Sequence, residues 1–412
     1  MINTFMANKA YTIRLNPTKE QEQQLKQTAG SARWLWNQSL DATKQAHKET
    51  GKFLFQYDLN KRIPELRKRH DWLAEANSQV LQQKNRDLDT ALKRSFKTHG
   101  FPKFKKKSHN SDSFRVPQHF QLSNKGVKLP KIGWVKWKPN RKLVGKAKSV
   151  TIKQDLDNWV AVVLCEKPDT PTRSDFMESE VVGIDVGIKD FAVLSNGIKI
   201  ANPKNLEKSE NLLKRKQRKL SKKVKGSQNR NKARKSVAKL HRHISNQRKD
   251  FQWKLASSIT KNYSVICMED LNIKGMMKNR RLAKSIGSVG WGLFKNKIGH
   301  KLAETGGLLI DIDRFAPSSK MCGSCEALND NLTLKDREWD CDCGAHHDRD
   351  INAAINIRSF GLDELNRLGT SRIYACGETT DGEPTKIGSS YVSMKQENLV
   401  IGPEAAESLV RR

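Results

Sequence analysis

Three acidic residues that are far apart in the chain each stand at the edge of a regularly patterned segment. Asp185 ends the apolar run 181–185, and Glu269 ends a second apolar run that begins at residue 263. Asp350 begins the run 350–357, whose apolar spacing predicts a helix. Short apolar runs bounded by turn residues are typical of buried strands. The three segments therefore predict an α/β domain that presents carboxylates from two strand ends and a helix start.

These carboxylates predict a shared metal centre. Phosphodiester cleavage by the two-metal route needs carboxylates that hold a pair of Mg²⁺ ions about 3.5–4 Å apart. Hard oxygen ligands suit Mg²⁺, and strand ends hold them rigidly. Gly183 and Gly187 flank Asp185, and their missing side chains are expected to let a nucleic-acid backbone approach. A lone acidic residue at a strand end is more often a solvated surface group, so the prediction depends on all three together.

The charge of the chain indicates a polyanionic partner. Its 77 Lys and Arg against 44 Asp and Glu give a formal net charge of +33. Such an excess self-repels, and nucleic acid is the expected counter-charge. An anionic membrane surface is the alternative, but no segment approaches the roughly 18 to 20 apolar residues that span a bilayer. The N-terminus lacks the apolar core of a secretory signal, so a cytoplasmic protein is expected.

Two basic segments are candidates for holding nucleic acid. Residues 214–249 carry 16 Lys and Arg and no Asp or Glu, yet they keep apolar residues at helical spacing on both sides of a Gly-Ser turn. This pattern predicts a basic helical hairpin over 207–250 with phosphate as its counter-charge, whereas a solvated disordered run is the alternative. A second stretch interleaves lysines with Phe101 and Phe104, which indicates a backbone clamp with stacking potential. The candidate contacts are Lys103, Lys105, Lys106, Lys107, Lys214, Arg215, Arg218, Lys222, Arg230, Arg234 and Arg242.

The remaining patterns predict several domains. A chain of 412 residues exceeds the size at which single cores stop growing. Short strand patterns near residues 9–15 and 127–164, interrupted by helical patterns, predict an N-terminal β-barrel with a helical insert. Thr18 and Gln21 form a capping-box signal for the first helix. The expected boundaries are 1–40 and 98–166 for the barrel, 41–97 for the helical insert, 167–180 for a linker, 181–315 and 347–360 for the α/β domain, 316–346 for a metal-binding insertion and 361–412 for a poorly ordered tail.

Four of the seven cysteines crowd into one segment. Two of them, Cys322 and Cys325, precede Cys341 and Cys343 by a gap of 15 residues. Two thiolate pairs suit one tetrahedral structural zinc, although the second pair is spaced more tightly than usual. His346 and His347 stand nearby, but four cysteines already fill the shell, and a disulfide is disfavoured in a reducing compartment. The other three, Cys165, Cys267 and Cys376, are expected to be ordinary residues, the first two within strands.

Several motifs match those of a known family. The segments Gly183–Ala192, Met268–Leu271 and His347–Ala354 resemble the three RuvC-type motifs of TnpB, the OrfB proteins encoded by insertion sequences. Further matches lie at 251–255, 278–283, 290–292 and 315–320. The resemblance runs from about Lys9 to Phe360, and the family in turn resembles the type V CRISPR effector nucleases.

The resemblance implies both a fold and an activity. The fold is a ribonuclease H-like (RuvC) nuclease domain with a zinc-binding insertion that contacts target nucleic acid, plus a wedge-type β-barrel with a helical recognition insert. The activity is that of an RNA-guided DNA endonuclease in a prokaryotic cytoplasm, with a guide RNA from the transposon end and double-stranded target DNA as partners. Asp185, Glu269 and Asp350 take the catalytic places around two Mg²⁺, with Asp348 and Asp190 as supporting residues.

The family also needs a short motif beside the target, which its helical insert and the adjacent barrel read. Here that means about residues 34–96 and 114–118. Amide and hydroxyl groups read base edges in the major groove, so the candidates are Gln56, Ser78, Gln79 and Gln82, with ordinary solvent-facing helix residues as the alternative. Two other functions remain open: a transposase acting directly on transposon ends, and an RNA-guided DNA-binding repressor that does not cut.

Overall fold

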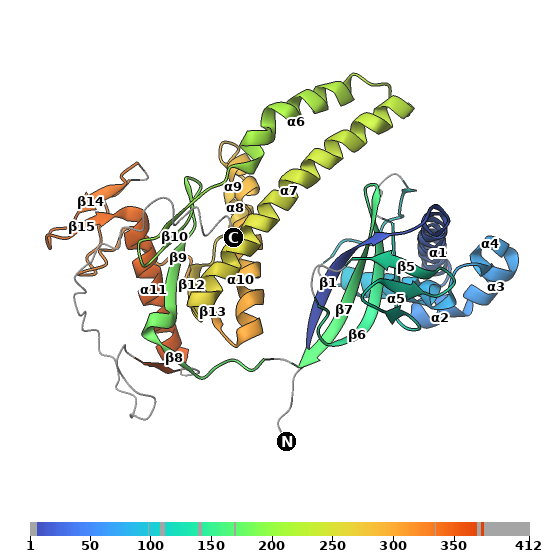
Figure 1. The fold of residues 1–412 in the computed structure, drawn as a ribbon, viewed down its shortest axis with the longest axis horizontal. Coiled ribbons are helices and arrows are strands. Elements are labelled where there is room, and N and C mark those ends of the chain that lie inside the picture. Colours follow the sequence, from blue (N-terminus) through green and yellow to red (C-terminus); the bar gives the residue numbers. More distant parts are fainter. Residues whose placement is uncertain are drawn as a thin grey trace. The chain divides into compact units, whose positions relative to one another are not determined.

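The computed structural model describes residues 6–97, 99–107, 112–138, 142–168, 170–333, 335–368 and 372–374. The chain divides into two compact units, Met1–Asp169 and Thr170–Arg412 (Figure 1). Among the described helices, none is both long and apolar enough to cross a membrane. Cys376 and residues 375–412 of the predicted tail lie outside the described residues.

The first unit is built on a seven-stranded antiparallel sheet. In sheet order the strands are β2 (Ser113–Val116), β6 (Lys146–Asp155), β7 (Asn158–Pro168), β1 (Met6–Asn16), β5 (Gly133–Trp137), β4 (Gly126–Leu129) and β3 (Gln121–Leu122). The alternating pattern of the first strand predicts its burial, and Tyr11, Ile13 and Leu15 belong to the core of this sheet. β1 is the central strand of the sheet, and it is paired with β7 along nearly its whole length.

Five α-helices lie between β1 and β2 in the part of this segment that the structure describes. They are α1 (Lys19–Thr50), α2 (Gln56–Lys61), α3 (Ile63–Arg69), α4 (Asp71–Ala74) and α5 (Ser78–Ser95). The predicted capping box starts α1, because the Thr18 hydroxyl accepts from the Gln21 amide and the Gln21 side chain accepts from the Thr18 amide. The first half of α1 packs Leu25 and Ala29 on the sheet, and its second half packs Leu35 among the smaller helices. The expected boundary at residue 40 is therefore wrong, since it cuts a continuous helix.

A closed barrel is not observed. The edge strands β2 and β3 have no pairing with each other in the described part of the chain, so the sheet is open. β3 has only two residues and β2 only four, which is too little backbone to close a barrel around seven strands. Short strands with glycine and proline between them fit both arrangements, and the sequence pattern does not separate them.

The second unit contains a five-stranded mixed sheet. In sheet order its strands are β11 (Lys199–Ala201), β10 (Asp190–Leu194), β9 (Val181–Asp185), β12 (Val265–Glu269) and β13 (Leu308–Ile312). β9, β12 and β13 are parallel, β10 pairs antiparallel with β9, and β11 pairs antiparallel with β10. Two small sheets, β8 (Asp175–Met177) with β16 (Arg372–Tyr374) and β14 (Glu338–Asp340) with β15 (His346–Asp348), complete the unit.

Helices cover both faces of this sheet, as the continuous apolar runs of its parallel strands predict. α7 (Gln228–Asn262), α9 (Ala283–Val289) and α10 (Trp291–Thr305) pack on one face, against residues such as Ile266 on β12. α11 (Arg349–Leu368) packs on the other face, where Cys267 is buried as expected for a small apolar residue. Cys165 is likewise buried in β7. Because α11 continues to Leu368, the start of the predicted tail at residue 361 is wrong.

Two glycines let α11 approach the sheet closely. A Cβ on Gly183 would overlap the carbonyl oxygen of Ala354 and lie 2.6 Å from the amide nitrogen of Arg358. A Cβ on Gly361 would lie 2.7 Å from the Cβ of Cys267. The expectation that Gly183 makes room for nucleic acid is therefore wrong, because the helix fills that space.

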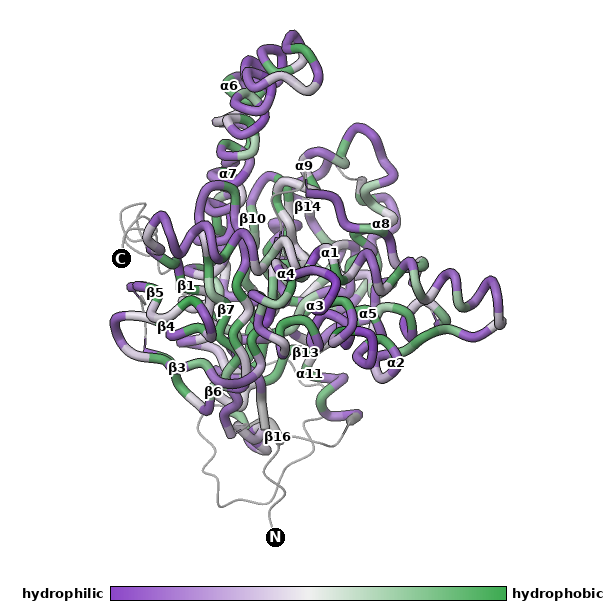
Figure 2. Tube along the Cα trace, turned by 90° about the vertical axis from the view of Figure 1, so that its right-hand side faces the viewer, coloured by the Kyte–Doolittle hydropathy of each residue, from purple (hydrophilic) through white to green (hydrophobic). Residues whose placement is uncertain are grey.

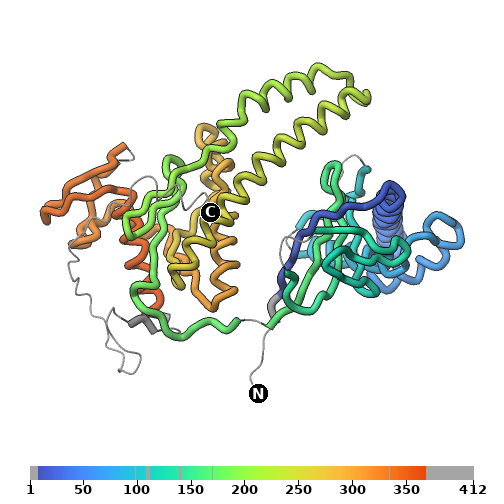
Figure 3. Tube along the Cα trace, viewed as in Figure 1, coloured from blue at the N-terminus to red at the C-terminus, as the bar shows by residue number. Residues whose placement is uncertain are grey.

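The predicted helical hairpin is present. α6 (Asn205–Ser221) and α7 run antiparallel (Figure 3). Leu213, Val237, Leu240 and Ile244 form the apolar cluster of this hairpin. Most of the hairpin is coloured as hydrophilic in Figure 2. α7 continues to Asn262, past the predicted end at residue 250, because its second half packs Ala256 and Ile259 on the sheet. A short α8 (Ile273–Met276) follows β12.

Candidate functional site

Two of the predicted carboxylates lie at the ends of neighbouring parallel strands. β9 ends at Asp185 and β12 at Glu269, and the preceding residues, Ile184 and Met268, are paired in register. The carboxyl ends of parallel strands meet at one edge of a sheet, where side chains can converge on a ligand. The local cause is that both strands are buried up to their last residue, at which each carboxylate emerges.

Asp350, the third predicted carboxylate, lies in the first turn of α11, the helix that packs closely against Gly183 on β9. Burial raises the pKa of Asp185 to about 7, and the charges of Glu269 and Asp350 add to the rise. Negative charges raise a carboxyl pKa only when they are close. The structure therefore brings the three predicted residues into one electrostatic group.

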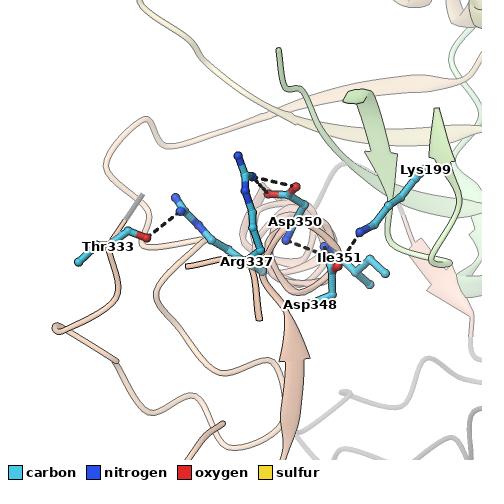
Figure 4. Close-up of polar contacts among 7 residues, drawn as sticks. Lys199, Thr333, Arg337, Asp348, Asp350 and Ile351 are labelled. Carbon is cyan, nitrogen blue, oxygen red and sulfur yellow. Dashed lines mark hydrogen bonds and ion pairs between the residues drawn. The ribbon is translucent and has the colours of Figure 1, made fainter. Parts of the chain in front are cut away.

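Asp348 has a supporting role that the structure makes specific. Its Oδ1 accepts hydrogen bonds from the backbone amides of Asp350 and Ile351, and its Oδ2 accepts one from Lys199 on β11 (Figure 4). Burial raises the pKa of Asp348, but its bonds with Lys199 and the helix amides outweigh that effect and leave the pKa lowered. Asp348 thus caps the helix that carries Asp350. Asp190, the other supporting candidate, begins β10 and pairs with Ala201.

Asp350 is paired with a cation that sequence reasoning missed. Arg337 Nη1 lies 3.2 Å from both carboxylate oxygens of Asp350 (Figure 4). The Arg337 carbonyl accepts from the Arg349 amide at 2.8 Å, which places the guanidinium beside the helix start. Among the described residues, only the four cysteines bring three or more metal-ligand atoms to one point. Asp350 would have to exchange Arg337 for a metal before the three carboxylates share an ion.

Glu269 has two partners that sequence reasoning also missed. Ser318 Oγ donates to Glu269 Oε1 at 2.6 Å, and Lys295 Nζ donates to the Glu269 backbone carbonyl at 3.1 Å. Lys295 is in turn paired with Asp311 at 2.9 Å. Ser318 lies in the matched segment 315–320, which is the only signal that could have singled it out.

The four predicted cysteines converge. Their Sγ atoms all lie within 4.8 Å of one another, with Cys322 to Cys343 at 3.8 Å and Cys325 to Cys341 at 3.5 Å. The two histidines are not in that group: His346 pairs with Asp340, and His347 Nε2 lies 3.0 Å from Cys322 Sγ as a hydrogen-bond partner. The thiolate set that the spacing predicts is therefore assembled by the fold.

The basic candidates on the α6–α7 hairpin differ in their surroundings. Lys214, Arg215, Arg218, Lys222 and Arg234 are exposed, whereas Arg230 and Arg242 are half-buried. Arg230 donates to the carbonyls of Leu220 and Lys223 at 3.1 and 2.7 Å, so its guanidinium holds the end of α6. Lys214 pairs with Glu210 at 2.8 Å. The exposed members are the better candidates for phosphate contacts.

The second basic stretch is fixed to α1. Asn37 Oδ1 accepts from the Lys105 amide at 2.8 Å, and Asn37 Nδ2 donates to the Lys105 carbonyl at 3.1 Å. Trp36 Nε1 donates to the Lys103 carbonyl. Lys105 Nζ lies 3.5 Å from the centroid of the Trp36 ring. Burial of this ammonium and the nearby Lys84 lower the pKa of Lys105 to about 8. All four lysines of the stretch, Lys103, Lys105, Lys106 and Lys107, are exposed as residues, although the Lys105 ammonium lies on the Trp36 ring.

The candidates for reading a target-adjacent motif lie on or beside the small helices. Gln56 begins α2, and Ser78, Gln79 and Gln82 lie in the first turns of α5, where Gln82 is exposed. Gln79 Nε2 donates to Gln118 Oε1 at 3.3 Å. This bond connects the helical insert with the segment 114–118, the two regions expected to read the motif.

Comparison with known proteins places the chain in a family. Residues 163–280 match the OrfB family of IS605-type elements, described as "Probable transposase", residues 291–357 match the TNB domain of Cas12f1-like proteins, and residues 6–52 match the helix-turn-helix domain of OrfB. A "Putative RNA-guided DNA endonuclease" from Streptomyces pristinaespiralis is 33% identical over 96% of this chain and 98% of its own length. The chain belongs to the TnpB (OrfB) family.

Two further similarities agree with this TnpB assignment. "Putative RNA-guided DNA endonuclease InsQ" of Escherichia coli K12 is 30% identical over 92% of this chain and 96% of its own. The Cas12f1 chain in a cryo-EM structure with sgRNA and target DNA aligns with a TM-score of 0.51 at 15% identity, covering 86% of this TnpB chain and 99% of that chain. At that identity the likeness concerns the fold alone. The stretch 6–52 forms β1 and the single helix α1 here.

Proposed function

We propose that this TnpB-family protein is an RNA-guided DNA endonuclease that hydrolyses target DNA at Asp185, Glu269 and Asp350. The observation that carries the proposal is the placement of the carboxylates: Asp185 and Glu269 end neighbouring parallel strands, and Asp350 lies in the first turn of the helix that packs on Gly183. Burial and the other two carboxylates also raise the pKa of Asp185, to about 7. Such crowding of like charges is typical of a site built for a cation. Relatives matched over nearly their whole length bear the name RNA-guided DNA endonuclease, which supports a guide RNA and a DNA target.

The donor set fits Mg²⁺. All three side chains offer hard oxygen ligands, and two of them come from rigid strand ends. Two Mg²⁺ held there would supply an activated water and stabilise the leaving oxygen of the phosphodiester. Asp348 and Lys199 fix the start of α11, so Asp350 is held at the edge of the sheet before any ligand arrives. The Arg337 guanidinium pairs with that carboxylate at 3.2 Å and would be displaced when the ion binds.

The cysteine cluster fits one structural Zn²⁺. Tetrahedral coordination at a Zn–S length of about 2.3 Å separates sulfurs by about 3.8 Å. The Cys322–Cys343 and Cys325–Cys341 separations of 3.8 and 3.5 Å are close to that value. Cys322 and Cys325 lie in one loop and Cys341 and Cys343 in another, so a shared ion would tie the two loops together next to the start of α11.

The remaining regions supply recognition in this proposal. The sheet of the first unit serves as the wedge domain, and its inserted helices with Gln56, Ser78, Gln79 and Gln82 read the motif beside the target. The exposed cations of the α6–α7 hairpin and Lys103 to Lys107 hold phosphates. The segment 316–346 with the cysteines contacts target nucleic acid, and guide pairing selects the sequence.

One cleavage experiment separates the proposal from its alternatives. Purified ribonucleoprotein is incubated with plasmids in Mg²⁺ or EDTA, using two guides of different sequence. Mg²⁺-dependent cutting that follows the guide supports the endonuclease, and its loss in Asp185→Ala but not in the exposed Asp363→Ala assigns the site. Joining of transposon ends without a guide would instead support a transposase, and guide-dependent binding without nicking a repressor.

A further inference from the structure

Glu269 is fixed at both its side chain and its backbone. Ser318 is only 4% exposed, and its hydroxyl donates to Glu269 Oε1 at 2.6 Å. Lys295 holds the Glu269 carbonyl at 3.1 Å. Hydrogen bonds to an ionised carboxylate are short and roughly twice as strong as neutral ones. Oε1 is thus engaged by a buried hydroxyl, and the rotation that would move Oε2 is restricted.

Ser318 is itself held by helix α11. Asn356 Nδ2 donates to the backbone carbonyls of Ser318 and Met321, each at 2.7 Å. Asn352 Nδ2 donates to the same Met321 carbonyl at 2.7 Å. The two asparagines are four residues apart, on one face of the helix, and are 1% and 0% exposed. They therefore clip the loop that carries Ser318 onto α11.

Asn352 also binds the loop that carries the first two cysteines. Asn352 Oδ1 accepts from the Gly323 amide at 2.9 Å, and a Cβ on Gly323 would lie only 2.9 Å from that oxygen. Gly323 follows Cys322, whose Sγ belongs to the four-sulfur cluster and which is fully buried. One helix thus presents Asp350 in its first turn and, through two buried amides, joins the first cysteine loop to the serine on Glu269.

We propose that Ser318 is a positioning residue for Glu269, and that Asn352 and Asn356 couple its hydrogen bond to the cysteine cluster. The inference rests on the proposed function, because it takes Glu269 as a ligand of a divalent cation. Partners that orient a metal ligand usually contribute 10- to 100-fold, as an order of magnitude, to metal affinity. Loss of the Ser318 hydroxyl is therefore expected to weaken divalent binding about 10- to 100-fold while leaving every carboxylate in place.

The test measures Mn²⁺ binding by calorimetry on the full zinc-loaded chain, without RNA or DNA. Ser318→Ala is expected to bind Mn²⁺ about 10- to 100-fold more weakly, and Ser318→Thr, which keeps the hydroxyl, within about threefold of the unmodified protein. Ser319→Ala is the matched control, since among the hydrogen bonds of the described residues the one to the Glu269 carboxylate comes from Ser318. In cleavage assays, Ser318→Ala should need more Mg²⁺ for half-maximal rate yet recover most of the rate at saturating Mg²⁺.

A double substitution tests the coupling. Cys325 is an exposed member of the cluster. Cys325→Ser alone should weaken Mn²⁺ binding, but adding it to Ser318→Ala should weaken binding little further, because both substitutions act through one network. Full additivity overturns the coupling, and Mn²⁺ binding by Ser318→Ala equal to that of Ser319→Ala overturns the positioning role. If Asp185→Ala also binds Mn²⁺ normally, the carboxylate site of the proposed function is wrong, and this inference is wrong with it.

Discussion

The crowded carboxylates should make the metal-free protein less stable as pH rises, and replacing Asp185 by Asn should relieve this. The pKa of Asp185 is raised from 3.8 to about 7, chiefly by burial and then by Glu269 and Asp350. The folded chain therefore keeps this proton to a higher pH than the unfolded chain does. Its stability falls between about pH 4 and pH 7 and does not fall further above that range.

The size of the effect follows from the shift. About three pKa units at about 1.36 kcal/mol each give a ceiling of about 4 kcal/mol. Asp185 is only half-buried as a residue, so solvent screening reduces this to about 2 kcal/mol. For a domain of this size, each kcal/mol shifts Tm by about 2–4 °C. Asp185→Asn should therefore raise the Tm by about 4–8 °C at about pH 8, and by less than half as much at about pH 5.

The assay is thermal unfolding of the metal-free chain across pH, with Asp363→Asn as an exposed control in the same unit. Saturating Mg²⁺ at about pH 8 should raise the Tm of the unmodified protein and leave that of Asp185→Asn nearly unchanged, because the ion replaces the missing counter-charge. A gain in Tm that is the same at both pH values, or that Asp363→Asn reproduces, would refute the reasoning.

Four further outcomes are expected. Arg337→Gln should tighten Mn²⁺ binding about two- to fivefold, since it removes the cation paired with the helix carboxylate; weaker binding in calorimetry contradicts this. Gly183→Ala should lower stability by about 3 kcal/mol or more in denaturant unfolding, because its Cβ would overlap the backbone of α11, whereas Gly299→Ala, with its nearest neighbour at 3.5 Å, should be tolerated. Cys325→Ser should reduce bound zinc and Tm together; a native chain without zinc by mass spectrometry would refute the cluster assignment. Lys222→Gln should reduce the salt slope of nucleic-acid binding by about one unit in a titration, and an unchanged slope would exclude a phosphate contact there.

Local patterns predicted much of the architecture. The capping box at Thr18, the buried strands that end at Asp185 and Glu269, and the two helices around Gly226 are encoded by residues close in sequence. The cysteine spacing predicted a cluster because metal ligands must converge whatever the fold between them. Hydrophobic periodicity reports the face of an element, so these predictions did not depend on tertiary contacts.

The rest depended on contacts between distant segments. The prediction of a closed barrel was wrong because the sequence of an edge strand does not show whether it pairs with the other edge. The role of Gly183 was misjudged because the helix that fills its space lies about 170 residues later in the chain. Arg337 and Ser318 were missed for the same reason: each partners a carboxylate only once the loops around the cysteines are folded.

The close seating of α11 at Gly183 and Gly361 also bears on how related sequences are judged. A copy could keep all three acidic residues and still lose the reaction through one added methyl group at Gly183, where β9 meets the helix that carries Asp350. If related sequences are classed as active only because they keep the three carboxylates, inactive ones would be counted as active. The clearance between helix and strand belongs in that inspection as much as the acids do.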